Sequence, residues 1–194
     1  MILYHASPYI IERPDVSYSR DFLDFGKGFY LTAIREQAEK YAMRFLRRGQ
    51  KAYINEYVLD EDLSEYNVMT FDRYDEAWLE YVGACRKGNG GVIYDIVSGG
   101  IADDKVFNTI DLYFAGEMSK EDALGRLAFE HPNHQICILN QNVILHHLKF
   151  KKATEITIGA SKNDMPALSG CLQNGYICLM RMPWAFFMIR KPMV

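Results

Sequence analysis

The chain has 194 residues, of which 49% are hydrophobic and 24% are charged, and its formal net charge is -3. These values suit an ordinary soluble protein that buries a sizeable core in one domain, or in one domain with an appendage. They argue against a broad, non-specific hold on nucleic acid or on an anionic membrane, because either normally needs a large basic surface.

Neither the cysteines nor the first residues indicate an exported protein. Cys85, Cys137, Cys171 and Cys178 show no Cys-x-x-Cys spacing, which favours reduced thiols over a disulfide framework or a zinc site. The chain start lacks a positively charged segment followed by an apolar core and a cleavage site, so we expect no secretory signal. The expected location is the cytoplasm, and no membrane partner is expected.

The chain starts with a predicted strand. Residues 2–4 read Ile-Leu-Tyr, and His5 follows where this strand is expected to meet a loop. A histidine in such a position can reach a bound ligand, although a hydrogen-bonded structural histidine is the commoner case.

Residues 24–32 form the most distinctive stretch, Asp-Phe-Gly-Lys-Gly-Phe-Tyr-Leu-Thr. Gly26 and Gly28 can adopt positive φ or let a ligand approach the backbone, and the bulky residues 29–31 suit a half-buried strand. The pattern therefore predicts a turn that leads into a strand. Taken alone, it also fits an ordinary glycine hairpin.

A helix is predicted over residues 33–48. Its apolar positions recur at helical spacing and are Ala38, Tyr41, Ala42, Phe45 and Leu46. Four basic residues gather at its end, namely Arg44, Arg47, Arg48 and Lys51. Cations are favoured at a helix C-terminus, so we interpret this group as a solvated helix end rather than a nucleic-acid patch.

The remaining elements follow from periodicity and capping signals. Expected strands cover residues 52–59, 92–97 and 133–139. Expected helices lie between Asp72 and Cys85, from Asp103 or Asp104 to before Gly116, from a capping box at Ser119 and Asp122, and around His146 and His147.

The last part of the chain differs in character. Residues 159–194 contain few acidic residues, several glycines and prolines, and two short apolar runs at 176–180 and 184–189. Neither run approaches the roughly 20 apolar residues of a membrane-spanning helix. The segment is open to three interpretations: an extra hairpin on the core, a partner-binding segment or a poorly ordered extension.

Three stretches, at residues 1–7, 24–32 and 133–139, resemble the diphtheria-toxin-like ADP-ribosyltransferases, whose core strands carry a histidine, then a tyrosine, then a glutamate or a substitute. The closer resemblance is to an uncharacterised bacterial domain family within that superfamily. The shared runs are Leu-Tyr-His at the start, the glycine turn and its strand, Ala-Asp-Asp-Lys-Val-Phe-Asn-Thr-Ile-Asp-Leu-Tyr-Phe in the middle, and Gln-Ile-Cys near the end.

This resemblance implies an α+β fold with an ADP-ribosyltransferase-like split sheet core and peripheral helices. It implies a domain over residues 1–155, followed by an extension over 156–194. The implied activity is that of a transferase of the glycosyltransferase class, a mono-ADP-ribosyltransferase that uses NAD as substrate without a metal. The implied partner is a macromolecular acceptor, and the net charge favours protein over nucleic acid.

The resemblance also implies roles for residues near the start of the chain. His5 would hydrogen-bond the adenosine ribose, and the backbone of Ala6, where relatives usually have glycine, would pair with the nicotinamide amide. Tyr30 would form one wall of the nicotinamide pocket, and Tyr41 would stack on the ring. The other residues of the expected cofactor-binding set are Ser7, Arg20, Lys27 and Gly28. Without the resemblance, Tyr41 fits a core tyrosine on an amphipathic helix. Arg20 and Lys27 could neutralise phosphate charge, but they also fit ordinary surface cations.

Gln135 falls where many of these enzymes carry a catalytic glutamate. An amide can orient the nicotinamide ribose, but it supplies neither the negative charge nor the general base of a carboxylate. The acceptor could supply its own carboxylate, or Glu130, Asp103 or Asp104 could compensate, although each also fits a solvated surface acid. Two alternatives therefore stay open: a catalytically silent module that binds NAD or a related nucleotide, and an NAD glycohydrolase.

No metal site is expected. His131 and His134 have a spacing that is sometimes seen in metal sites, but Pro132 lies between them and no nearby cysteine completes a ligand set. A polar loop explains these two histidines better.

Overall fold

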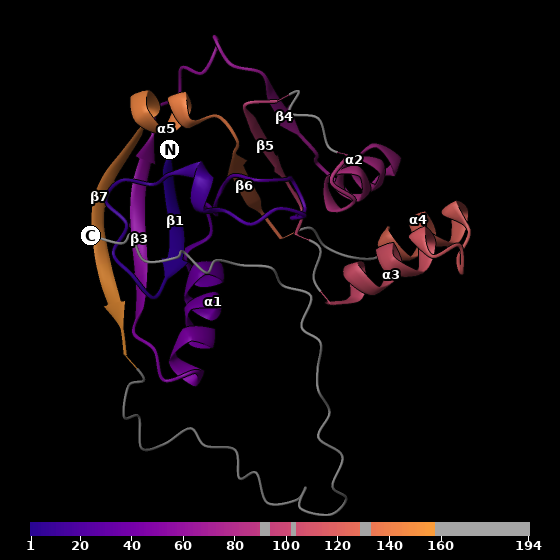
Figure 1. Cartoon of the computed structure of the whole chain (residues 1–194), viewed down its shortest axis with the longest axis horizontal. Coiled ribbons are helices and arrows are strands. Elements are labelled where there is room, and N and C mark those ends of the chain that lie inside the picture. The colour runs from indigo at the N-terminus through magenta and orange to yellow at the C-terminus, as the bar shows by residue number, and fades with distance from the viewer. Residues whose placement is uncertain (90–93, 102–103, 129–132, 158–194) are drawn as a thin grey trace, which may run out of the picture.

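The computed structural model describes residues 1–89, 94–101, 104–128 and 133–157, and these residues form an α+β fold (Figure 1). Within them the chain forms two β-sheets and five α-helices. The helices are α1 (Arg35–Arg47), α2 (Glu76–Arg86), α3 (Asp104–Phe114), α4 (Lys120–Leu127) and α5 (Gln141–His147), and a short 3-10 helix η1 covers Val16–Tyr18.

The first sheet joins the two ends of the described chain. Its strands are β1 (Ile2–Ser7), β3 (Ala52–Leu59) and β7 (Leu148–Ile156), which pair antiparallel in the order β1-β3-β7. The central strand β3 is buried along most of its length, as its aromatic and β-branched sequence favours. The edge strand β7 is half-exposed and rich in lysine, a composition that protects a sheet edge from pairing with another chain.

The second sheet has the order β2-β6-β5-β4. Its strands are β2 (Phe29–Leu31), β6 (Gln135–Ile138), β5 (Ile96–Gly99) and β4 (Val68–Thr70). Strand β6 pairs antiparallel with β2 and with β5, whereas β4 and β5 are parallel. The two sheets are linked where Tyr4 and Thr32 exchange backbone hydrogen bonds of 2.8 and 3.0 Å.

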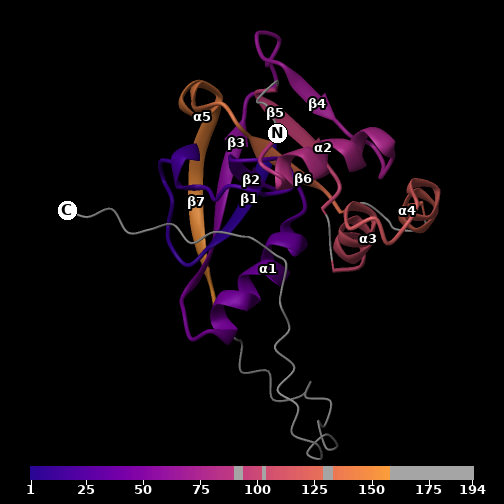
Figure 2. The same ribbon diagram turned by 45° about the vertical axis from the view of Figure 1, so that its right-hand side comes forward.

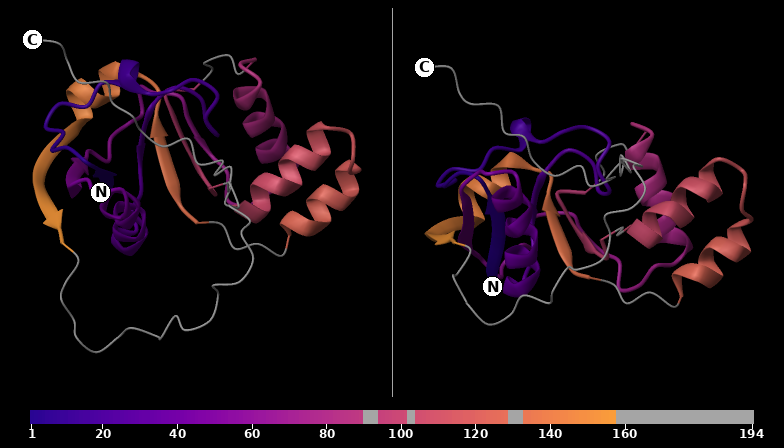
Figure 3. Two further views of the ribbon diagram at one scale, coloured as in Figure 1. Left: turned by 60° about the horizontal axis from the view of Figure 1, so that its bottom comes forward. Right: turned by 90° about the horizontal axis from the view of Figure 1, so that it is seen from below.

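The helices lie in two separate groups. Helix α1 packs against β1 and β3 through the small residues Ala38 and Ala42 and through Phe45. Helices α2, α3 and α4 gather beside the second sheet, on the far side of the molecule from β7 (Figures 1 and 2). The views from below show the same separation, with α1 next to β1 (Figure 3).

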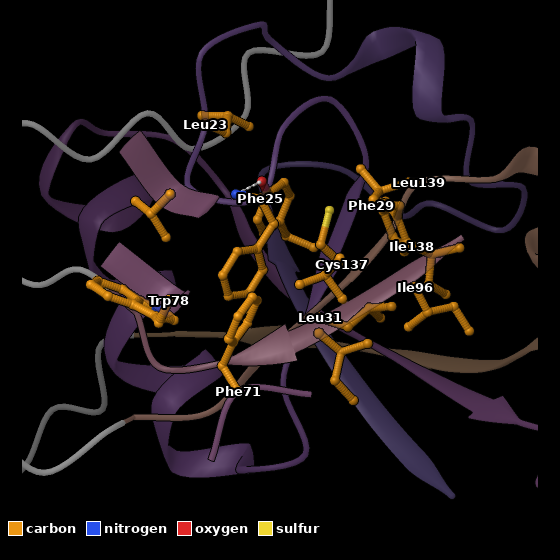
Figure 4. Close-up of a cluster of buried hydrophobic side chains, with 14 of the residues drawn as sticks. Leu23, Phe25, Phe29, Leu31, Phe71, Trp78, Ile96, Cys137, Ile138 and Leu139 are labelled. Carbon is orange, nitrogen blue, oxygen red and sulfur yellow. Dashed lines mark hydrogen bonds between the residues drawn. The ribbon is translucent and has the colours of Figure 1, made fainter. Parts of the chain in front are cut away.

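The main core extends from the second sheet and its helices to residues of the first sheet, and the glycine turn contributes to it. Phe25, from that turn, is 1% exposed. Its ring lies 6.3 Å from the ring of Phe71, centroid to centroid, and Trp78 is buried nearby (Figure 4). The turn at residues 24–28 is therefore anchored in the core and does not project as a free hairpin.

The structure confirms several expected elements with similar bounds. Strand β3 covers the predicted residues 52–59, and α1 lies within the predicted range 33–48. The cap at Ser119 is also present, since its hydroxyl accepts a hydrogen bond of 3.1 Å from the backbone N–H of Asp122.

Other expectations need correction. His5 lies inside β1, because this strand pairs with β3 as far as Ser7. Of the strand expected over 92–97, β5 begins only at Ile96, and residues 90–93 lie outside the described residues. The structure adds β4 and β7, which the pattern did not predict. Nearly all of the expected C-terminal extension, residues 158–194, also lies outside the described residues.

Among the described residues, no helix combines the length and the apolarity that crossing a membrane requires.

Candidate functional site

A cavity of about 240 Å³ opens between α1 and the strands where the two sheets meet. Its volume is slightly below the range of roughly 300–1,000 Å³ that is typical of small-molecule sites. Strands β1, β2 and β6 and helix α1 supply most of its lining. The lining residues are Tyr4, His5, Ala6, Tyr30, Leu31, Thr32, Gln37, Ala38, Lys40, Tyr41, Arg44, Ile101, Asn133 and Gln135.

The cavity brings together five of the residues predicted from the sequence. They are His5, Ala6, Tyr30, Tyr41 and Gln135. They come from four elements that are far apart in the chain, so only the folded structure places them around one space.

His5 is a buried, neutral histidine. Its Nδ1 lies 2.8 Å from the backbone oxygen of Tyr30. Since a carbonyl oxygen only accepts hydrogen bonds, Nδ1 carries the proton and Nε2 has the lone pair. Burial lowers the pKa of His5 to about 4, against the weaker opposite effect of the Tyr30 carbonyl. At neutral pH the ring therefore offers an acceptor at Nε2.

Gln135, at the first position of β6, is 2% exposed. Its Nε2 donates to the backbone oxygen of Gly100 at 3.3 Å and to Oδ2 of Asp24 at 3.4 Å. Both partners are acceptors, so the amide must point its NH2 group towards them. Its Oε1 is buried and has no hydrogen-bond partner among the described residues. Gln135 therefore presents an acceptor oxygen rather than a donor.

The Asp24 carboxylate lies next to the NH2 group of the Gln135 amide. Its Oδ1 accepts hydrogen bonds from Arg86, at 3.0 Å from Nε and 2.5 Å from Nη2. The two side chains are only 12% and 15% exposed. The Arg86 guanidinium also lies over the ring of Phe107, 4.4 Å from its centroid. The first residue of the glycine-turn motif thus holds Gln135 in place with a charge that is itself paired.

Tyr30 uses its hydroxyl to close the glycine turn. The hydroxyl donates to the backbone oxygen of Gly26 at 2.7 Å and accepts from the backbone N–H of Phe25 at 3.0 Å. Gly26 has φ of 88°, a conformation that glycine adopts readily. Burial raises the pKa of Tyr30, with further increases from Cys137 and Asp24. Tyr30 therefore lines the cavity and fixes the turn, while its hydroxyl is bonded to backbone.

Helix α1 presents a polar stripe to the cavity. Gln37, Lys40, Tyr41 and Arg44 are spaced at i, i+3, i+4 and i+7, so they share one face of the helix. The Arg44 guanidinium lies over the Tyr41 ring, 5.0 Å from its centroid. Burial raises the pKa of Tyr41 to about 12, although nearby arginines oppose this rise. The stripe gives one side of the cavity a positive charge.

The sequence interpretation missed most of this stripe. Arg44 was expected at a solvated helix end, but it lines the cavity. The available signal was the polar 3.6-residue period of Gln37, Lys40 and Arg44 beside the apolar stripe of α1. No comparable signal links Asp24 with Arg86, because they are 62 residues apart.

Four other predicted residues lie outside the cavity lining. Ser7 is fully buried and its hydroxyl accepts from the backbone N–H of Tyr9. Lys27 and Arg20 are exposed, although the charge of Arg20 acts on Tyr41. A Cβ at Gly28 would lie 2.5 Å from the sulfur of Cys137, so β6 explains this glycine without a ligand.

The structure does not describe the side chains of the three acidic residues that could compensate for Gln135. Asp103 and Glu130 lie outside the described residues, as does the side chain of Asp104. His131 is also outside them. In the parts of the chain that are described, no group of three or more His, Cys, Asp or Glu residues could hold a metal ion.

The fold and the cavity define an α+β protein with a mostly apolar, partly basic site at the junction of two sheets. The chain belongs to the family described as "Protein of unknown function (DUF3990)", whose model matches residues 1–150. This match includes every residue that lines the cavity. Searches of the curated proteins and of the solved structures returned no significant match.

Proposed function

We propose that the protein is a mono-ADP-ribosyltransferase that transfers ADP-ribose from NAD to a macromolecular acceptor. One observation carries this proposal: His5, Ala6, Tyr30, Tyr41 and Gln135, which the resemblance to diphtheria-toxin-like ADP-ribosyltransferases assigns to an NAD site, line a single cavity. The junction of the two sheets at this cavity is also compatible with the split sheet core of that superfamily.

The chemistry of the cavity suits this reaction. Breaking the bond between nicotinamide and ribose creates oxocarbenium-like positive charge on the sugar. The Oε1 of Gln135 is a fixed partial negative charge that would stabilise this sugar without having to reorient. The Nε2 of neutral His5 would accept from a ribose hydroxyl. Tyr41 would stack on the flat leaving group, and Lys40 and Arg44 would neutralise the pyrophosphate.

A second candidate is a silent module that binds NAD without cleaving it. The position of Asp24 favours this alternative, because this carboxylate sits behind Gln135 and pairs with Arg86. Its charge is partly neutralised there, and an amide separates it from the cavity. An NAD glycohydrolase, which uses water as the acceptor, is the third candidate.

Two labelled forms of NAD separate these functions. Release of labelled nicotinamide measures cleavage, and adenine-labelled NAD with cell lysate shows whether ADP-ribose becomes attached. We expect release together with label that protease removes from the acceptor. Binding of NAD without release would favour the silent module, and free ADP-ribose as the sole product would favour hydrolysis. Tyr41→Leu should strongly lower nicotinamide release, whereas the control Tyr18→Leu, at an exposed position outside the cavity, should not.

A further inference from the structure

Two residues that line the cavity have a buried amide oxygen without a hydrogen-bond partner among the described residues. These oxygens are Oε1 of Gln135 and Oε1 of Gln37 on α1. Buried acceptors of this kind are rare in folded proteins, because they give up hydrogen bonds to water and gain nothing in return. Two such oxygens on residues that line one cavity lead us to infer that a ligand supplies the donors.

In both amides the NH2 group donates a hydrogen bond, so the group without a partner among the described residues is the oxygen. Gln37 donates through Nε2 to the backbone oxygen of His134 at 2.9 Å, and Gln135 donates to the backbone oxygen of Gly100. A carbonyl oxygen cannot donate, so neither amide can turn over without losing its bond. His134, which accepts from the Gln37 amide, directly precedes Gln135 in the chain. The two glutamines are therefore joined to adjacent residues of the backbone.

The side chains near these two residues favour an anionic ligand. Lys40 and Arg44 follow Gln37 on the same face of α1 and line the same cavity. At 1.5 Å per residue, Arg44 is about 10 Å further along the helix than Gln37. A matching ligand therefore has neutral hydrogen-bond donors at one end and phosphate groups within about 10 Å of them.

We propose that Gln37 and Gln135 form a paired acceptor subsite for the two hydroxyls of a phosphorylated ribose. This inference rests on the proposed function, and within it the ribose is the one that bears the reacting carbon. Gln37 is then a ligand-contacting residue, and the donors come from the sugar. In the competing explanation, Gln37 only joins α1 to β6 through its bond to His134.

Calorimetric titration of the full chain with two probes separates these explanations. ADP-ribose carries the second ribose, whereas ADP has the phosphates without it. The parent should bind ADP-ribose more tightly than ADP. Gln37→Met removes both the acceptor and the donor, while Gln37→Glu keeps an acceptor oxygen and removes the donor. We expect Gln37→Met to weaken ADP-ribose binding about three- to tenfold, as for one lost hydrogen bond, with ADP binding unchanged.

The ratio of the two affinities identifies the role of Gln37. Gln37→Glu should keep the parent's preference for ADP-ribose over ADP. If Gln37→Met changes both probes equally or changes neither, or if Gln37→Glu loses the preference as Gln37→Met does, the subsite is refuted. The unfolding midpoint of each variant confirms that it is folded.

A third probe needs no variant. An ADP-ribose analogue that lacks the hydroxyls on C2 and C3 of the terminal ribose should bind the parent no better than ADP, and binding as tight as that of ADP-ribose would overturn the subsite. Equal binding of ADP-ribose and ADP by the parent would also refute the subsite while leaving nucleotide binding intact. If the parent bound neither, both this inference and the NAD site would be wrong.

Discussion

The pair formed by Asp24 and Gln135 makes a strong prediction about Gln135→Glu. This substitution restores the glutamate expected at the position, but it also removes the NH2 group that donates to Asp24 and to the Gly100 carbonyl. The introduced carboxyl, if ionised, would face a carboxylate and a carbonyl oxygen, and neither can donate a hydrogen bond. If protonated, it could donate to either. The structure therefore favours the protonated form of the introduced acid.

The size of this effect follows from the distance. The donor nitrogen of Gln135 lies 3.4 Å from the Asp24 oxygen. Two unit charges at such a separation repel by about 5 kcal/mol at an effective dielectric constant of about 20. Arg86, which pairs with Asp24, offsets part of this repulsion. We expect the pKa of the introduced carboxyl to rise from about 4.3, the value for a free glutamate, to about 6.5–7.

A raised pKa has a defined consequence for stability. In the unfolded variant the introduced carboxyl loses its proton near pH 4.3, but in the folded variant it keeps the proton to about pH 6.5–7, so the folded state binds more protons between these values. The unfolding free energy of Gln135→Glu should therefore fall by about 3 kcal/mol relative to the parent as the pH rises from about 4.5 to about 7.5. Denaturant titration of both proteins at several pH values measures this difference.

The double variant Asp24→Asn with Gln135→Glu is the matched control. It exchanges the amide and the carboxylate, so the repulsion disappears and the pH-dependent loss should disappear with it. Asp24→Asn alone provides the reference for the double variant. A Gln135→Glu protein whose stability parallels that of the parent over this whole pH range would show that Asp24 does not face position 135.

Three further predictions concern other residues of the site and of the glycine turn. The pKa of His5 is about 4 in the folded state against 6.5 when free. The unfolding free energy of the parent should therefore fall by about 3 kcal/mol relative to that of His5→Gln as the pH falls from about 6.5 to 4. A pH-independent difference in unfolding free energy would contradict this. Gly28→Ala should destabilise the fold by about 1–3 kcal/mol, because the new methyl would lie 2.5 Å from the sulfur of Cys137. In the same denaturant titration the control Gly125→Ala, in open space on α4, should be neutral or stabilising. Arg44→Met should weaken ADP binding at least about tenfold, as for a lost charged hydrogen bond, and exposed Arg47→Met should not; equal effects in calorimetry would remove Arg44 from the site.

Local sequence signals were sufficient for most elements of the fold. Strand β3 could be predicted because its aromatic and β-branched residues are unambiguous. Strand β7 was missed because its sequence, Leu-Lys-Phe-Lys-Lys-Ala-Thr-Glu-Ile, is rich in charge, and charge disguises an edge strand. Its lysines become informative only after folding, when Lys151 pairs with the buried carboxylate of Glu56 on β3 at 2.6 Å.

The candidate site was predictable only in part, because contacts between residues far apart in the chain hold it together. The resemblance named His5, Tyr30, Tyr41 and Gln135, but not what holds them. The orientation of the Gln135 amide depends on Gly100 and Asp24, which are 35 and 111 residues away in the chain. Contacts of this kind leave no periodic pattern, so no sequence window can contain them.

These contacts also change the role that the glycine turn has in the site. From the sequence, the turn was expected to expose backbone to a ligand, but Phe25 is in the core and Gly28 lies against β6. The turn instead acts through Asp24, which holds the Gln135 amide, and through Gly26, whose carbonyl holds the Tyr30 hydroxyl. A single short motif thus fixes residues on two neighbouring strands, β2 and β6, whose separation and orientation set the shape of the cavity.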